Sequence, residues 1–259
     1  MNRRMFLAAA IPFAVAGCGF RPFGFRPFTF IQIGDPQFGF SSGGDGNSFA
    51  VEADVLERVV KAINRIRPAP SFVAICGDLT HLPGHAGQIA AYRRIIGMVD
   101  PSIPVHVAPG NHDFQTSLSM ESIEAYRKLF GPDRSSFEVQ GWRFIMLNSV
   151  LLQPPEKRPD ELAAQTEWLK KTLAGARRAH ARGIVAFMHH PFTDDDISGA
   201  SPNPQRRMYL DLFAENKVTA VFSAHTHNTV PEKTYRGVRL VNTNGLVRSF
   251  DNNPGLRIV

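Results

Sequence analysis

Short apolar segments that each end in a cluster of polar residues recur along this chain. They are predicted at residues 28–33, 72–76, 105–108, 184–188 and 218–223. Stretches of helical period lie between them, as at residues 50–66, where Val51, Val55 and Val59 recur at helical spacing. This alternation predicts an α/β protein. Loops at the carboxyl ends of strands in such proteins converge on one edge, so the polar clusters are expected to form a single site.

The remaining periodic segments complete the prediction. Helices are predicted at residues 85–99, 119–130, 159–182 and 204–216, a hairpin at 136–139 and 142–147, and a last strand at 238–241. No linker or charge run divides the middle of the 259 residues, which predicts one domain at residues 28–259.

Composition excludes several classes of protein. Hydrophobic residues make up 43% and charged residues 20%, which is ordinary globular usage and argues against disorder and against a multi-pass membrane protein. The net charge of +6 is spread along the chain, so nucleic acid is not an expected partner. Only Cys18 and Cys76 are present, and no structural disulfide is expected. A monomer is expected.

The first residues are predicted to be a targeting signal rather than part of the fold. Arg3 and Arg4 precede an apolar run too short to span a bilayer comfortably, which indicates a signal peptide at residues 1–17. The run ends in a sequence that resembles the bacterial lipobox, which implies a lipid on Cys18 and a tether at residues 18–27. The two arginines resemble a twin-arginine signal, and a general secretory signal is the alternative. The chain is therefore expected to be exported and held on a membrane of the bacterial cell envelope.

The polar clusters offer oxygen and imidazole ligands. Carboxylate, amide oxygen and imidazole suit hard to borderline divalent cations, and no convincing thiolate cage is present. Because one carboxylate can bridge two cations, a pair of metals could share it and assist a phosphoryl transfer.

The ordered motifs resemble the calcineurin-like metallophosphoesterase family. They read Gly34-Asp35-Pro36-Gln37, Gly77-Asp78, Gly110-Asn111-His112-Asp113, Met188-His189-His190-Pro191 and Ala224-His225-Thr226-His227. The resemblance implies a four-layer α/β/β/α sandwich of two mixed sheets. It also implies two divalent metal ions, which could be Mn²⁺, Fe²⁺ or Zn²⁺.

The resemblance assigns a role to each motif residue. It implies Asp35, Gln37 and His227 on the first metal, Asp78 as the bridge, and Asn111, His189 and His225 on the second. A metal-bridging hydroxide would be the nucleophile. His112 would protonate the leaving group, and Asp113 would orient His112. His81 and His190 would face the substrate or support the ligands.

Two residues depart from the family pattern. Gln37 stands where most members have histidine, and its neutral amide oxygen would bind the first metal more weakly. Ala224 replaces a glycine, which adds a methyl group beside the site without removing a ligand.

The expected activity is hydrolysis of a phosphorylated substrate. The Asp35–Gly39 and Gly77–Gly84 segments resemble a subgroup of protein phosphatases, which favours a phosphomonoester. A phosphodiesterase, including a nuclease with a basic groove beside the site, is one alternative. A lipid-anchored protein that binds a phosphorylated ligand without turnover is another.

Overall fold

The computed structural model describes residues 26–42, 48–114, 118–153, 158–201, 203–247 and 255–259. The predicted signal peptide, and residues 18–25 of the predicted tether, lie outside these ranges. Among the described residues, no helix combines the length and apolar composition needed to cross a bilayer.

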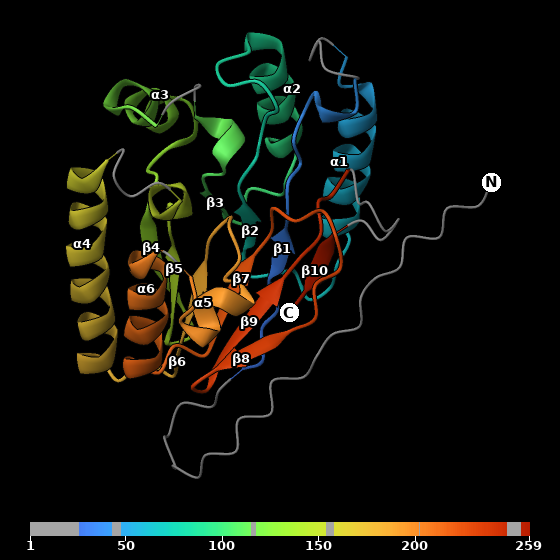
Figure 1. The fold of residues 1–259 in the computed structure, drawn as a ribbon. Coiled ribbons are helices and arrows are strands. Elements are labelled where there is room, and N and C mark those ends of the chain that lie inside the picture. Colours follow the sequence, from blue (N-terminus) through green and yellow to red (C-terminus); the bar gives the residue numbers. More distant parts are fainter. Residues whose placement is uncertain (1–25, 43–47, 115–117, 154–157, 202, 248–254) are drawn as a thin grey trace.

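The strands form two mixed sheets (Figure 1). The first has the order β10-β1-β2-β3, with β1 at Ile31–Ile33, β2 at Val73–Cys76, β3 at Val105–Ala108 and β10 at Leu256–Ile258. The second has the order β4-β5-β6-β7-β9-β8, with β4 at Ser135–Val139, β5 at Trp142–Met146, β6 at Gly183–Phe187, β7 at Ala220–Ser223, β8 at Lys233–Tyr235 and β9 at Val238–Asn242. Among the described strands, only β10, β4 and β8 pair antiparallel with their neighbours, so the other strands direct their carboxyl ends to one edge.

Helices cover the outer faces of both sheets (Figure 1). The α-helices are α1 at Ala50–Ile63, α2 at Ala86–Ile96, α3 at Met120–Phe130, α4 at Pro159–Arg178, α5 at Asp194–Ser198 and α6 at Pro204–Glu215. Within the described ranges, short 3-10 helices occur at Phe40–Ser42, Asn111–Asp113 and Ser149–Leu152. With α1 and α2 on the first sheet and α4 and α6 on the second, the predicted four-layer sandwich is confirmed.

Side chains that alternate in direction along the strands form two kinds of apolar layer, one between sheet and helices and one between the two sheets. Ile31 and Ile33 face the helices, whereas phenylalanines at the inward positions stack between the sheets. Phe72, beside β2, lies 4.8 Å from the ring of Phe30 and 4.7 Å from that of Phe144 on the opposite sheet. Close aromatic packing therefore sets the spacing of the two sheets beneath the predicted site.

A buried hydrogen-bond chain also joins the sheets. Gln32 of β1 donates from Nε2 to the carbonyl oxygen of Ser223 at 3.0 Å, and its Oε1 accepts from Thr243 at 2.6 Å. Because an unpaired buried amide is costly, these hydrogen bonds favour one relative position of the two sheets.

Most predicted elements are present with ends shifted by a few residues. The long helix ends at Arg178 rather than at residue 182, where the chain turns through His180 in a left-handed conformation. Strands β8 and β10 and helix α5 were not predicted. Each spans five residues or fewer, which is too short for a clear periodic signal.

Candidate metal centre

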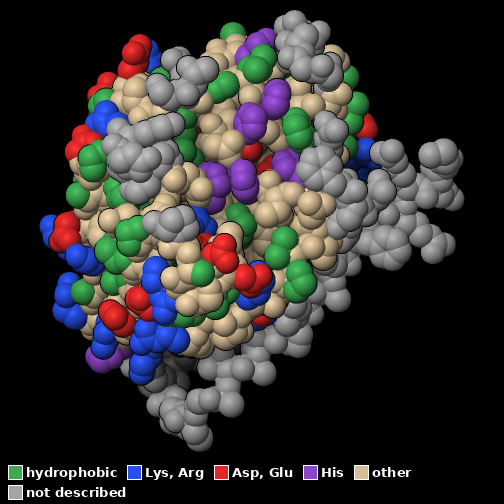
Figure 2. Space-filling model, viewed as in Figure 1, with side chains coloured by type: hydrophobic (Ala, Val, Ile, Leu, Met, Phe, Trp, Pro, Cys, Tyr) green, Lys and Arg blue, Asp and Glu red, His purple; other side chains and the backbone are tan. Residues whose placement is uncertain are grey.

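The structure brings all the predicted site residues to the carboxyl edge of the two sheets. Asp35 and Gln37 follow β1, Asp78 and His81 follow β2, and Asn111, His112 and Asp113 follow β3. His189 and His190 follow β6, and His225 and His227 follow β7. The first sheet thus supplies the carboxylates, the amides and two imidazoles, and the second sheet supplies four imidazoles. Figure 2 shows histidine side chains gathered at the centre and upper part of this face.

His189 lies at the centre of the cluster. Its Nδ1 donates to the carbonyl oxygen of Cys76 at 2.8 Å, which leaves Nε2 facing the other polar groups. Nε2 lies 3.0 Å from Nδ1 of His225, 3.1 Å from Oδ1 of Asn111 and 3.3 Å from Oδ2 of Asp78. These atoms belong to the four residues that the family resemblance assigns to the second metal and to the bridge.

The residues assigned to the first metal surround Asp35. This buried carboxylate lies 3.1 Å from Nε2 of His227 and accepts the backbone N–H of His225 at 3.1 Å. Gln37 is also buried, and its Oε1 has no hydrogen-bond partner among the described residues. Since buried carbonyl oxygens are normally satisfied, this atom is suited to a cation.

The backbone at the site is strained. Five of the seven predicted ligands have positive φ angles: Asp35 at 39°, Gln37 at 30°, Asp78 at 50°, His225 at 76° and His227 at 52°. Such conformations cost on the order of 1 kcal/mol each for residues other than glycine and cluster at functional sites. The strain aims these side chains at one another, at the expense of local stability.

Three glycines allow the loops to approach each other. A Cβ on Gly110 would lie 2.2 Å from Oδ1 of Asp78, and a Cβ on Gly77 would lie 2.6 Å from the backbone nitrogen of Gly110. A Cβ on Gly34 would lie 3.0 Å from that of Ala224. The additional methyl of Ala224 is therefore accommodated because position 34 is glycine.

The charges at the site favour a cation. Burial raises the pKa of Asp78, but the neighbouring His189 outweighs burial and holds that pKa well below its usual value. Burial and the charge of His189 together lower the pKa of His225 to about 4, so its imidazole is neutral near pH 7 and can act as a ligand. Burial raises the pKa of Cys76 to about 12, which excludes a thiolate ligand there.

These observations fit a pair of divalent cations. Ligand atoms of Asp35, Asp78 and His189 all lie within 4.8 Å of one another, and so do those of His189, His190 and His225. Imidazole nitrogen, carboxylate and amide oxygen suit borderline cations, and a ligand atom of Asp78 lies within 4.8 Å of those of both Asp35 and His189.

His112 is oriented differently from the expectation. Its Nδ1 donates to the carbonyl oxygen of His81 at 3.0 Å, and its backbone N–H donates to Asp78 at 2.9 Å. Asp113 instead accepts the backbone N–H groups of Gly110 and Leu79, both at 2.8 Å. The His81 carbonyl thus takes the orienting role predicted for Asp113, because the Asp113 side chain is occupied in joining two loops.

Asp113 also differs in charge from an ordinary carboxylate. Burial and the charge of Asp78 raise its pKa to about 7, against the hydrogen bonds from Gly110 and Leu79. Its described contacts make it a support for the ligand loops.

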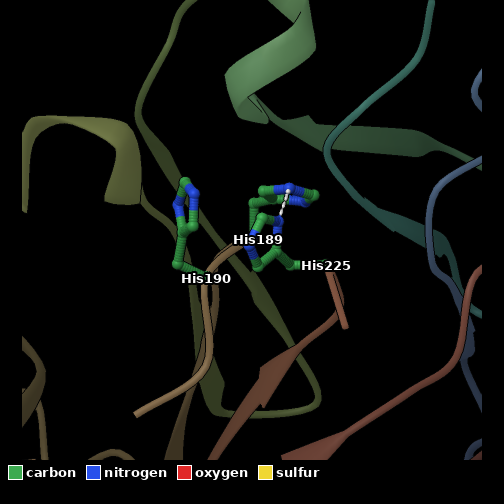
Figure 3. A group of neighbouring side chains, drawn as sticks. All are labelled: His189, His190 and His225. Atoms are coloured by element: carbon green, nitrogen blue, oxygen red, sulfur yellow. Dashed lines mark hydrogen bonds between the residues drawn. The ribbon is translucent and has the colours of Figure 1, made fainter. Parts of the chain in front are cut away.

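His190 projects beside the joined pair of His189 and His225 (Figure 3). Ser149 Oγ accepts the backbone N–H groups of both His189 and His190, at 3.2 and 2.9 Å, so its own hydrogen can be donated to His190 Nδ1 at 3.1 Å. Nε2 of His190 then carries a proton. Sequence reasoning missed Ser149, because it follows a strand of the hairpin rather than one of the motifs.

His81 stacks on His112 with a centroid distance of 4.8 Å. The ring of Phe40 lies 5.2 Å from that of His81 and 5.0 Å from that of His227. Phe40 is therefore a wall of the site, whereas Phe38 is fully buried against Phe49 and belongs to the core.

The fold and this set of ligands define a metallophosphoesterase. Residues 28–229 match the calcineurin-like phosphoesterase family, and the chain belongs to that family of phosphoric ester hydrolases. It is 34% identical over 251 residues to the serine/threonine-protein phosphatase CPPED1 of Homo sapiens. The aligned region covers 90% of this chain and 80% of the relative.

Solved structures share the fold. A dimetal phosphatase from Danio rerio superposes with a TM-score of 0.62 at 18% identity, covering 89% of this chain and 91% of that one. The purple acid phosphatase PPD1 from yellow lupin (Lupinus luteus) superposes with a TM-score of 0.55 at 16% identity, covering 77% of this chain and 38% of that one.

We predict that Gly110→Ala weakens metal binding. The new Cβ would overlap the Asp78 carboxylate, which must move away from His189. Calorimetric titration with Mn²⁺ should show affinity reduced by about tenfold or more. Gly175→Ala is the matched control, since its Cβ would meet only the Arg178 side chain at 4.0 Å. Unchanged binding in Gly110→Ala would contradict the close approach of the two loops.

Proposed function

We propose that this chain is a metal-dependent phosphomonoesterase that acts on phosphorylated protein. The observation that carries the proposal is the convergence of ligand atoms from both sheets around Asp78 and His189, with His112 directly beside them. The relatives named serine/threonine-protein phosphatases support the choice of a monoester.

The ligand assignments follow the two groups of contacts. Asp35, Gln37 and His227 would hold one cation, Asn111, His189 and His225 the other, and Asp78 both. When bound, two such cations lower the pKa of a water molecule and neutralise charge on the phosphoryl oxygens. We propose Mn²⁺, Fe²⁺ or Zn²⁺, because the ligands mix imidazole nitrogen with oxygen.

His112 is the proposed general acid. Since Nδ1 is held by the His81 carbonyl, Nε2 is the atom that can give a proton to the departing alkoxide. Burial and the neighbouring His112 lower the pKa of His81, so His81, which stacks on His112, favours its neutral form. His190, with a proton on Nε2, would be a hydrogen-bond donor beside the ligands rather than a third imidazole ligand.

The alternatives receive less support from the described residues. A nuclease would need cations beside the site, but Lys and Arg side chains on the face in Figure 2 gather at the lower left, away from the central histidines. A binding protein without turnover would not need an oriented His112. A phosphodiesterase shares the same ligands and is left to the experiment below.

We also propose that residues 1–17 are a signal peptide and that Cys18 carries a lipid, which places residues 28–259 outside the cytoplasm on a membrane of the cell envelope. The support is the basic start, the apolar run and the small residues before Cys18.

Removal of metal should abolish hydrolysis reversibly. We expect chelator-stripped protein to regain turnover of a chromogenic phosphomonoester when reloaded separately with Mn²⁺, Fe²⁺ or Zn²⁺, with a chromogenic phosphodiester cleaved more slowly. His112→Asn should lower kcat by about a hundredfold or more with both metals retained, because the proton donor is lost. Asp78→Asn should lose metal and turnover together.

Three results would contradict this proposal. Turnover without metal would remove the proposed chemistry, and full activity in His112→Asn would remove the acid. Faster cleavage of the diester would select the alternative activity.

Gln37→His should tighten the weaker of the two metal sites by about tenfold, because imidazole is a stronger donor than an amide oxygen. Histidine also tolerates the left-handed backbone at this position. Gln140→His is the matched control, since Gln140 has a φ of 51° in the hairpin between β4 and β5, away from the site. Equal affinity in the two variants would show that Gln37 is not a ligand.

Cys18→Ser should move the protein from the membrane fraction to a soluble fraction of the cell envelope, since the thiol that accepts the lipid is lost. Metabolic labelling with a fatty acid, followed by fractionation, tests this. Labelling that persists in Cys18→Ser would refute the assignment.

A further inference from the structure

The edge of the fold opposite the metal centre is basic. The loops at the amino ends of the parallel strands lie here, at residues 64–72, 97–104, 179–182 and 216–219. Exposed cations occupy these loops and the adjoining end of α4: Arg65, Arg67, Arg177, Arg178, Arg182 and Lys217. Asp100 is the single acidic residue within these four loops, and exposed Glu215 closes α6 beside the last of them.

The topology explains why these cations share one edge. Each crossover helix begins at the carboxyl ends of the strands and ends at the amino ends, so the ends of α1 and α4 and the loop after α6 come together. Arg177 and Arg178 close α4, where positive charge also complements the helix dipole. Figure 2 shows Lys and Arg side chains, with some Asp and Glu among them, along the lower left of the molecule, below the histidines.

The chain enters the fold at this same edge. Arg26 is exposed and lies a few residues before β1, whose amino end is at this edge. Arg26 is eight positions after Cys18, and a fully extended chain over that distance reaches at most about 30 Å. A lipid on Cys18 would hold the basic edge near a bilayer.

We propose that this basic edge docks on a membrane surface that carries anionic lipid, with the metal centre facing the solvent. The proposal goes beyond the proposed hydrolysis and uses the predicted lipid only to bring the edge close. Attraction between exposed charges acts over about 8–10 Å at physiological salt, so the cations hold the domain against the surface once the tether has placed it there.

A membrane fits these observations better than nucleic acid does. The cations lie in separate loops along the amino edges of both sheets and at the end of α4, rather than along one helix or groove. Docking on this edge leaves the opposite edge free to receive a phosphorylated substrate from the aqueous side.

The test uses the full chain with Cys18→Ser, which removes acylation and leaves any contribution of the apolar leader equal in every sample. Sedimentation with phosphatidylcholine vesicles is compared with sedimentation with vesicles that contain a third phosphatidylglycerol, at low and at high salt. The variant Arg65→Glu, Arg177→Glu, Arg178→Glu is compared with Arg58→Glu, Lys128→Glu, Lys171→Glu, which changes the net charge equally on exposed helix surfaces elsewhere. Replacement of the same three arginines by Gln repeats the test if the first variant is poorly folded.

We expect binding to the anionic vesicles that weakens with salt. It should fall by about tenfold or more in the basic-edge variant and clearly less in the control. Equal loss in both variants, or equal binding to neutral and anionic vesicles, would overturn the proposal. Random-sequence duplex DNA is a further probe: DNA binding lost in the basic-edge variant, with vesicle binding retained, would assign the edge to nucleic acid instead. Because phosphoesterase activity is not measured, failure here leaves the proposed hydrolysis untouched.

Discussion

The contact between the carboxyl edges of the two sheets determines the rest of the site. His189, from the second sheet, donates to the carbonyl oxygen of Cys76 on the first at 2.8 Å, and this single bond turns its Nε2 toward Asn111 and Asp78. Aromatic packing beneath it and the Gln32 hydrogen bonds hold the edges at that separation. A centre assembled from both sheets depends on their relative position and therefore on the core.

The site is maintained at a cost in backbone conformation. Asp35, Asp78 and His225 all have left-handed φ angles, and the ligand loops approach so closely that Gly110 has no space for a Cβ. Carboxylates and imidazoles gathered in a buried cluster add an electrostatic cost that a cation relieves. Such local conflict, in a chain whose strands and helices otherwise follow their sequence pattern, is expected where function rather than stability determines the residue.

The sequence predicted the fold and the residues that meet, because the apolar strands end in chemically matched motifs in a fixed order. It could not predict contacts that depend on loop geometry. The hydrogen bond from His112 to the His81 carbonyl is one example, since no side chain marks a carbonyl as a partner. Ser149, which fixes the proton of His190, is another, because a serine after a strand carries no signal of its own. The basic amino edge was not predicted, since Arg65 and Arg178 are far apart in sequence and are brought to one edge by the topology.

We propose that ligands from both sheets hold two cations that share Asp78. Crystals soaked in Mn²⁺ and measured at the manganese absorption edge test this proposal. We expect two anomalous peaks, one on each side of the Asp78 carboxylate, with His189 and His225 at one and Asp35 and His227 at the other. A single peak, or peaks away from Asp78, would contradict it.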